Sequence, residues 1–222
     1  MYISSKQLRP DIIIIGAGII GLSIAYHLLE VDPKLSITIV EREKMLGLGS
    51  TGKCTGGIRY QFSSSLLRRL SLLSRDFFLN FESVFDVPCW YLEKGYLMLA
   101  SHGVLWNQLQ STAEQAEAES IPMQLLKHEE LQEQFPYLDR DRFLGGTLCP
   151  WDAYADPYAV LAALYAAVRS KGAAVDFNRE ATKIILNGDN LRGLETKQGT
   201  IWSPIIVNAA GPYAAQIAMS SS

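Results

Sequence analysis

The pattern of apolar and polar positions predicts an alternating α/β start to this chain. An apolar run of strand length follows Asp11, breaks at a cluster of glycines and continues as a helical pattern over residues 19–30. A loop containing Pro33 leads to a second apolar strand at 36–40. Strand, helix and strand in this order are typical of a βαβ unit, in which the two strands are parallel.

The rest of the pattern predicts two further groups of elements. The first group contains a helix at 63–81, a β-hairpin of 89–93 and 96–100 around Lys94-Gly95, helices at 104–120 and 127–135, and a strand at 143–149. The second contains a helix at 158–170, opened by Asp156-Pro157, and short strands at 173–177, 182–187, 191–196, 200–202 and 205–207. Because the pattern changes at Val84, we expect a first domain part over 1–83, an inserted domain over 84–150 and a second part of the first domain over 151–222.

Three glycines after the first strand have the spacing of a dinucleotide-binding fingerprint. Gly16 permits a tight turn, Gly18 removes a side chain where a pyrophosphate approaches the backbone, and Gly21 lets the helix pack closely on the strand. Free N–H groups and the helix dipole favour phosphates at this helix N-terminus. Glu41 ends the second strand, twenty residues after Gly21, where this fold places an acceptor for ribose hydroxyls and where a 2′-phosphate would be repelled. The alternative is an ordinary buried strand, turn and helix followed by solvated charges.

A second glycine-rich segment, 47–59, follows the second strand. It has five glycines in the eleven residues from Gly47 to Gly57, a content that we expect to be too flexible for a packed element without a ligand. The segment is either a mobile linker or a loop wrapped on a cofactor, and its place soon after Glu41 favours the loop. The last apolar strand runs into 208–213, where small residues would again let the backbone touch a ligand.

Composition and charge exclude several classes of protein. With 222 residues, 48% of them hydrophobic, the chain is long enough to bury a core and is not expected to be disordered. The net charge of −3 provides no basic surface for nucleic acid, and we interpret Arg68-Arg69 as part of a solvated helix face. The nearly uncharged stretch 12–29 resembles a signal peptide or membrane anchor, but its glycines and the preceding Asp11 argue against both. We therefore expect no transmembrane segment.

The cysteines and histidines form no pattern typical of a disulfide framework or a metal site. Cys54, Cys89 and Cys149 are far apart and odd in number, and no histidine stands at metal-ligand spacing from them. We expect no metal, no catalytic role for any of the three histidines, and a reducing compartment, which we take to be the cytoplasm.

Several motifs together resemble a known family. The chain contains IIIIGAGIIGLSIAYHL, IVERE, GSTGKCTGGIRYQF and IVNAAGPYA, together with the Asp156-Pro157 helix start. These motifs are similar to the FAD-dependent D-amino acid oxidase superfamily, and within it to sarcosine oxidase β subunits and L-proline dehydrogenase β subunits. The resemblance spans residues 11–215 and implies a Rossmann-like FAD-binding domain of the GR2 type with an inserted α+β substrate domain.

The resemblance also implies which residues hold the cofactor. The implied FAD-binding residues are Gly16, Ala17, Gly18 and Gly21 at the pyrophosphate, Glu41 at the ribose, Arg42 and Ala181 at the adenine, Gly49, Ser50 and Thr51 along the pyrophosphate and ribityl chain, Lys53, Cys54, Thr55 and Gly56 at the isoalloxazine, and Ala209, Ala210 and Gly211 over the cofactor. Relatives with a histidyl-linked flavin have His where this chain has Lys53, so the resemblance implies non-covalent FAD.

Two residues have implied roles in the reaction itself. Arg59, ten residues after Gly49, would anchor the substrate carboxylate, for which a planar guanidinium is suited. Lys53 would stabilise negative charge on the reduced flavin. The alternatives are a loop arginine paired with a local acid and an exposed lysine that makes no flavin contact.

The implied reaction is oxidation of a small amino acid or N-methyl amino acid, of the sarcosine, proline or glycine class, at its C–N bond by an oxidase or dehydrogenase. A hydride equivalent would pass to flavin N5. Two other functions stay open: a 2-hydroxy-acid oxidoreductase on the same scaffold, and a non-catalytic flavin-binding or assembly subunit. Because members of this family normally continue well past the last strand predicted here, a second polypeptide or a homo-oligomer would complete the site, and the chain alone would be inactive.

Overall fold

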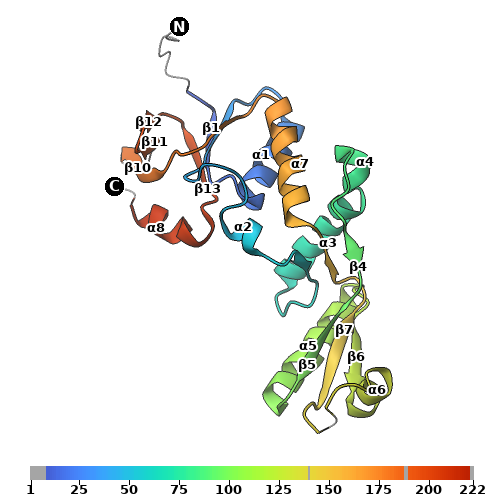
Figure 1. The fold of residues 1–222 in the computed structure, drawn as a ribbon. Helices are drawn as coiled ribbons and strands as arrows, with labels where there is room; N and C mark the ends of the chain where they lie inside the picture. The colour runs from blue at the N-terminus through green and yellow to red at the C-terminus, as the bar shows by residue number, and fades with distance from the viewer. Residues whose placement is uncertain (1–8, 140, 188–189, 221–222) are drawn as a thin grey trace. The chain divides into compact units, whose positions relative to one another are not determined.

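The chain forms two compact units. The computed structural model describes residues 9–139, 141–187 and 190–220 (Figure 1). The first unit contains the described residues up to Cys54 and from Pro157 onward, and the second contains Thr55–Asp156. Our predicted divisions lay after 83 and after 150. Residues 55–83 belong to the second unit because its strand β3 (Gly57–Ile58) pairs with β8 (Ala153–Tyr154), a partner far away in the sequence.

A parallel sheet forms the centre of the first unit. Its strand order is β13 (Ile205–Asn208), β1 (Ile12–Ile15), β2 (Ile37–Val40) and β9 (Ala174–Asp176), and all neighbours are parallel. Helix α1 (Ile19–Val31) connects β1 to β2. The predicted βαβ unit is therefore confirmed, and the carboxyl ends of β1, β2 and β13 lie at one edge of the sheet.

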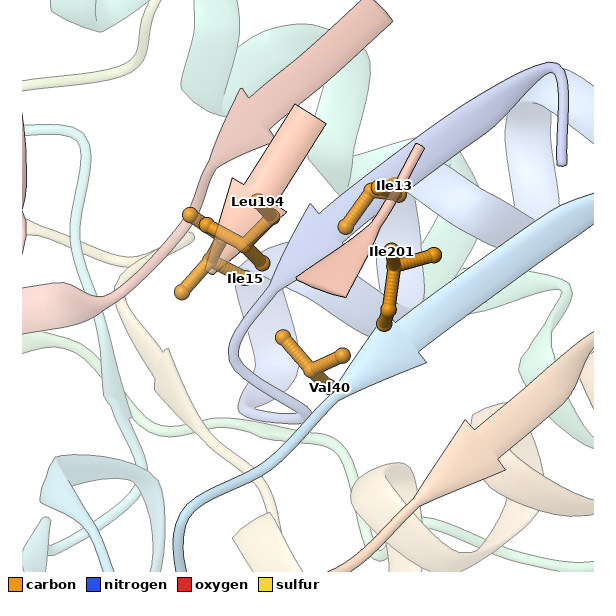
Figure 2. Close-up of a cluster of buried hydrophobic side chains, with 5 residues drawn as sticks. All are labelled: Ile13, Ile15, Val40, Leu194 and Ile201. Carbon is orange, nitrogen blue, oxygen red and sulfur yellow. The ribbon is translucent and has the colours of Figure 1, made fainter. Parts of the chain in front are cut away.

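Both faces of the parallel sheet are covered. The elements of the first unit beyond this sheet are α2 (Ser50–Lys53), α7 (Pro157–Ser170), β10 (Ala181–Asn187), β11 (Asn190–Thr196), β12 (Gly199–Ile201), the 3-10 helix η1 (Gly211–Tyr213) and α8 (Ala214–Met219). Ile14 points toward α1, where its Cγ2 lies close to Gly21. On the other face, residues of β1 and β2 pack against the antiparallel sheet β10-β11-β12, and this cluster contains Ile13, Ile15, Val40, Leu194 and Ile201 (Figure 2). A strand buried on both faces must be apolar throughout, which explains the unbroken isoleucine run of β1.

The second unit is built around a different sheet. Its antiparallel sheet has the order β5 (Tyr96–Ala100), β7 (Gly145–Cys149) and β6 (Gln124–Lys127), and β3 and β4 (Leu92–Glu93) flank β8 in a small second sheet. Its helices are α3 (Ser65–Leu79), α4 (Phe81–Phe85), α5 (Gly103–Ala118) and α6 (His128–Gln134). Strand β6 was not predicted because its sequence, QLLK, has only two apolar residues and no alternation.

The predicted β-hairpin of 89–93 and 96–100 is wrong. Strand β4 pairs with β8 and strand β5 with β7, so the two segments belong to different sheets. The N–H groups of Lys94 and Gly95 donate instead to the carbonyl oxygen of Asp152, at 3.2 and 2.8 Å, and Gly95 has a φ of 76°. A turn that is held by a residue so distant in the sequence cannot be recognised from the local pattern.

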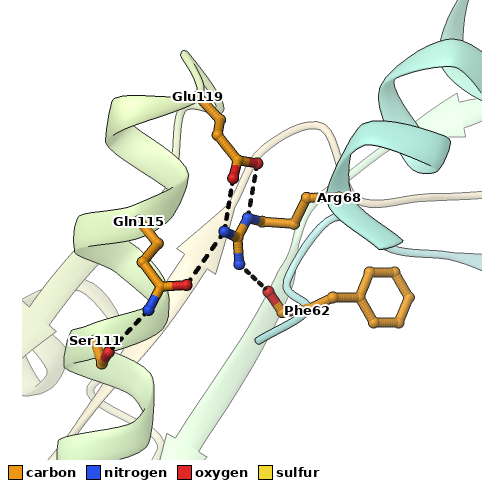
Figure 3. Close-up of polar contacts among 5 residues, drawn as sticks. All are labelled: Phe62, Arg68, Ser111, Gln115 and Glu119. Carbon is orange, nitrogen blue, oxygen red and sulfur yellow. Dashed lines mark hydrogen bonds and ion pairs between the residues drawn. The ribbon is translucent and has the colours of Figure 1, made fainter. Parts of the chain in front are cut away.

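The interpretation of Arg68-Arg69 as a solvated face is wrong for Arg68, whose exposed fraction is 1%. Figure 3 shows its polar contacts. Its Nε and Nη2 donate to the two carboxylate oxygens of Glu119 at 2.8 and 2.7 Å. Its Nη1 donates to the Phe62 carbonyl at 2.6 Å, and Nη2 also donates to Gln115 Oε1 at 3.2 Å. Since a buried guanidinium requires such partners, Arg68 joins α3 to α5 rather than facing water.

Within the described part of the chain, no helix is both long enough and apolar enough to span a membrane.

Candidate functional site

The turn between β1 and α1 has no room for side chains at two of its glycines. Gly16 has a φ of 103°, and a Cβ placed on it would lie 2.5 Å from the carbonyl oxygen of Ala209. A Cβ on Gly21 would lie 1.9 Å from the carbonyl oxygen of Gly16. These contacts bring the end of β13 against the turn, where the N–H of Ala209 donates to the Ile15 carbonyl at 3.0 Å. Gly16 and Gly21 therefore serve the packing that the fingerprint predicts.

The start of α1 at Gly18 is bordered by Thr51. Gly18 is the N-cap residue and supplies no capping oxygen, whereas Thr51 Oγ1 accepts a hydrogen bond from the N–H of Ile19 at 3.1 Å. A Cβ on Gly18 would meet only Thr51 Oγ1, at 3.3 Å, and a Cβ on Gly49 would meet nothing within 4 Å, counting the described residues. An anion could approach the backbone at both glycines, beside the positive end of the helix dipole.

Glu41 is fixed at the same edge of the sheet. Its Oε2 accepts from the N–H of Ala17 at 2.8 Å, and its Oε1 accepts from the N–H of Glu43 at 3.0 Å. The Glu41 N–H donates to Asp176, and its carbonyl accepts from Arg179. An ionised carboxylate has about four acceptor sites, so the two bonds leave capacity for ribose hydroxyls. The acidic residue is thus tied directly to the glycine turn.

Arg42, the residue after Glu41, contacts an aromatic ring that our sequence reasoning did not assign to the site. Its guanidinium lies over the ring of Tyr213, 3.8 Å from the ring centroid. A hydrogen bond with Tyr213 raises the pKa of Arg42 above its ordinary value. Tyr213 lies in η1, directly after Ala209, Ala210 and Gly211, so this contact joins the ends of β2 and β13. The only sequence signal for it was an aromatic residue following Gly-Pro.

The small residues after β13 and Ala181 have mostly backbone roles. The N–H of Ala210 donates to Asn208 Oδ1 at 3.3 Å, and Gly211 has a φ of 56°. Ala181 is the first residue of β10, pairs with Thr196 and packs against the cluster of Figure 2.

The glycine-rich segment is more ordered than we predicted. Ser50–Lys53 form the helical turn α2, and Tyr158 of α7 donates from its hydroxyl to the Gly52 carbonyl at 2.9 Å. Gly47, with a φ of 78°, lies so close that a Cβ on Gly52 would be 1.9 Å from its carbonyl oxygen. The glycines of this segment allow these close backbone contacts. Ser50, Lys53 and Cys54 are exposed, and the Cys54 thiol donates to the Thr51 carbonyl at 3.0 Å.

Thr55, Gly56 and Arg59 belong to the second unit. Gly56 accepts a hydrogen bond from Ala155 at 3.0 Å, and Thr55 and Arg59 are exposed. The Arg59 guanidinium lies over the ring of Tyr96, 5.5 Å from the ring centroid.

Next to Arg59, the sequence reasoning missed a buried carboxylate, Asp152, which has an exposed fraction of 0%. Burial raises the pKa of Asp152, while hydrogen bonds from Gln61 and Tyr60 and the charge of Arg59 act in the opposite direction. No sequence motif marks this residue. The described residues contain no cluster of three or more His, Cys, Asp or Glu side chains that could hold a metal ion.

The sequence profile of the FAD dependent oxidoreductase family, DAO, matches residues 11–221. The chain belongs to this family. It is 28% identical over 209 residues to human mitochondrial dimethylglycine dehydrogenase, covering 94% of this chain and 24% of that protein. It is 25% identical over 213 residues to the mouse mitochondrial pyruvate dehydrogenase phosphatase regulatory subunit, covering 96% of this chain and 24% of that protein.

Solved structures of the DAO family share the fold. The L-proline dehydrogenase of P. horikoshii superposes with a TM-score of 0.82 at 26% identity, covering 96% of this chain and 55% of that one. The chain thus spans about a quarter of the length of the curated relatives named above and about half of this structural relative.

The first unit fits the family's cofactor. The start of α1 with no side chain at Gly18, the space at Gly49, and a fixed acceptor at Glu41 fit the pyrophosphate and ribose of FAD.

Proposed function

We propose that this chain binds FAD and forms the cofactor-binding part of an oxidoreductase that acts on the C–N bond of a small amino acid or N-methyl amino acid. The observation that supports this most is the hydrogen bond from Ala17 to Glu41, because it joins the phosphate-binding turn to the ribose acceptor. Family membership makes the cofactor FAD rather than NAD.

Each group of residues would have its own part in binding FAD. Gly18 and Gly49 leave the backbone accessible to the pyrophosphate, and the dipole of α1 opposes its negative charge. Glu41 would accept from the ribose hydroxyls, and Thr51 holds the first turn of α1 in place. We further propose that Ser50, Cys54, Thr55 and Gly56 continue the site toward the isoalloxazine and that Arg42, Ala181, Ala209, Ala210 and Gly211 enclose the other end.

FAD would be held without a covalent bond. Lysine stands at position 53, where histidyl-linked relatives have histidine by the resemblance of the GSTGKCTGG motif. The exposed ammonium group of Lys53 is free to approach a ligand, and it would stabilise negative charge at the flavin.

The substrate would be an amino acid recognised through its carboxylate. Arg59 would bind the carboxylate with two parallel hydrogen bonds, and its exposed position in the second unit supports this role. Dimethylglycine and L-proline, which appear in the names of two relatives, share a carboxylate and a secondary or tertiary amine. When bound, FAD supplies the two-electron chemistry by accepting a hydride equivalent. A second polypeptide or a second copy of the chain would complete the pocket, which we take as part of the proposal.

A non-catalytic subunit is the second candidate. The mouse relative is a regulatory subunit by name, and it matches nearly the whole of this chain. Such a protein would bind FAD at the same residues without oxidising an amino acid.

We also propose a cytoplasmic location. Cys54, Cys89 and Cys149 are free thiols, and Cys54 is exposed, as is usual in a reducing compartment.

The proposed function is tested by adding FAD to the purified chain, measuring its visible spectrum and releasing the cofactor with acid. Sarcosine, dimethylglycine, L-proline, glycine and lactate are then added anaerobically, with and without the completing polypeptide. We expect FAD retention, and bleaching of the flavin by one of the amino acids once the pocket is complete. Colourless protein that binds NADH would contradict the cofactor assignment, and bleaching by lactate alone would contradict the substrate class. FAD retention with no bleaching in the complete protein would favour the regulatory subunit.

A further inference from the structure

Asp152 lies at the centre of a buried polar network in the second unit. Its Oδ1 accepts from the N–H of Tyr60 at 2.6 Å, and its Oδ2 accepts from Gln61 Nε2 at 2.6 Å. Strand β3 ends at Ile58, which pairs with Ala153, so the backbone of 58–61 runs alongside the segment that contains Asp152. Asp152 therefore holds the two residues that directly follow Arg59.

Gln61 extends the network to the backbone of Tyr96, the residue whose ring lies beneath Arg59. Gln61 Nε2 also donates to the Tyr96 carbonyl at 2.7 Å, and Gln61 Oε1 accepts from the Thr147 hydroxyl at 2.6 Å. The amide orientation is fixed, because the carboxylate of Asp152 and the carbonyl of Tyr96 can only accept. The Tyr96 hydroxyl is itself close to Gly57, where an added Cβ would lie 2.6 Å away. One network thus fixes both the backbone after Arg59 and the backbone of Tyr96, whose ring the guanidinium overlies.

The charges in this region also favour a defined position for Arg59. Both direct donors to the Asp152 carboxylate are neutral, an amide and a peptide N–H, so its negative charge is not neutralised within the network. The positive charge of Arg59 acts on this carboxylate and is itself exposed. A buried carboxylate is costly unless it is hydrogen-bonded and near a cation.

We propose that Asp152, with Gln61, is a positioning residue that orients Arg59 for substrate carboxylates. This inference rests on the proposed function, in which Arg59 is the carboxylate anchor. Asp152 touches neither substrate nor flavin in this role: it acts through the backbone of Tyr60, through Gln61 and the backbone of Tyr96, and through its charge.

The test uses the full chain with FAD bound, complemented by the completing polypeptide, and the variants Asp152→Asn, Arg59→Ala and the double variant. Asparagine keeps the shape of aspartate, but its amide must place a donor against either Gln61 or Tyr60. Sarcosine and L-proline are the probes, followed through the flavin spectrum. We expect Asp152→Asn to raise the KM of the substrate about tenfold with a smaller change in kcat and unchanged FAD retention, since a hydrogen bond to a charged group is lost. The double variant should bind no more weakly than Arg59→Ala, because Asp152 acts through Arg59.

A second measurement reports the position of Arg59 without any ligand. Trypsin cleaves after arginine, and the N–H of the Arg59–Tyr60 peptide bond is the group that Asp152 holds. We expect faster cleavage at this bond in Asp152→Asn, measured by mass spectrometry, and no change in Asp76→Asn, which removes an exposed carboxylate of α3 in the same unit. If Asp152→Asn does not fold, Thr147→Val removes the outer hydrogen bond to Gln61 and should produce a smaller change in the same direction.

The outcomes separate the inference from the proposed function. Unchanged cleavage and unchanged KM in Asp152→Asn overturn the inference, while weaker substrate binding in Arg59→Ala than in wild type upholds Arg59 as the anchor. The inference is also overturned if Asp152→Asn raises the KM by the same factor in the Arg59→Ala background as in wild type, because this indicates a general structural role. If the wild type binds no substrate, or if Arg59→Ala leaves substrate binding unchanged, the proposed function is overturned, and the inference with it.

Discussion

The two units of this chain are stabilised in different ways. The largest fully buried side chains of the first unit are all isoleucines and leucines, whereas those of the second unit include Arg68 and Tyr60. Asp152 and Thr147 of the second unit are also fully buried, and both belong to hydrogen-bond networks. Apolar layers define where the strands of the first unit end and therefore where a cofactor can lie. Directional polar contacts in the second unit fix single side chains, as a substrate-binding residue requires.

The largest effect should come from the apolar layering of the first unit. Gly21→Ala places a Cβ 1.9 Å from the Gly16 carbonyl, so helix α1 must move away from the turn. We expect a loss of about 3 kcal/mol in the free energy of unfolding, measured by urea denaturation. Gly49→Ala is the matched control, because its Cβ would meet none of the described residues within 4 Å. Equal stability of both variants would contradict the close packing.

A smaller loss is expected from the polar contacts of the second unit. Arg68→Ala removes the guanidinium that donates to Glu119, Phe62 and Gln115 (Figure 3). The Glu119 carboxylate then lacks its bidentate partner. We expect the free energy of unfolding to fall by about 2 kcal/mol. This loss is below the range for fully buried ion pairs because the Glu119 side chain is 22% exposed. The exposed neighbour Arg69→Ala should change the unfolding free energy little. Similar effects of the two substitutions on the free energy of unfolding would contradict a stabilising role for the buried Arg68.

The cofactor edge can be tested through Glu41. Glu41→Gln removes the charge and turns an amide donor toward the N–H of either Ala17 or Glu43. We expect FAD affinity to fall by about 1.5 kcal/mol, close to tenfold, in titration calorimetry, with the fold retained. Glu195→Gln, an exposed carboxylate of β11, serves as the control. Unchanged affinity in Glu41→Gln would exclude Glu41 from the site.

The smallest effect concerns acid stability. The hydrogen bond from Arg68 lowers the pKa of Glu119 from 4.5 to about 2. A lowered folded-state pKa stabilises the folded protein above the unfolded value, so this contribution should be lost as the pH falls from 4.5 toward 2. In urea unfolding, the free energy of unfolding of the wild type should decline between these pH values. Glu119→Gln should lack this decline. Glu117→Gln, at an exposed position of α5, should retain it. The same decline in Glu119→Gln would assign the acid sensitivity to other groups.

The sequence alone determined the parallel core and the glycine turn. The isoleucine run of β1, the spacing of Gly16, Gly18 and Gly21, and Glu41 after β2 are local signals, since each depends on backbone geometry or on burial of contiguous residues. These signals also carried the resemblance to the DAO family, which the family comparison confirmed.

Only the tertiary structure decided the polar organisation of the second unit. The hairpin prediction failed because β4 pairs with β8 and β5 with β7, at least 45 residues away in the sequence. Arg68 and Asp152 look like solvated charges in the sequence, yet their partners Glu119 and Gln61 come from distant segments. A charged side chain carries no periodic signal that distinguishes burial from exposure, because its burial depends on whether the fold brings a partner within hydrogen-bond distance.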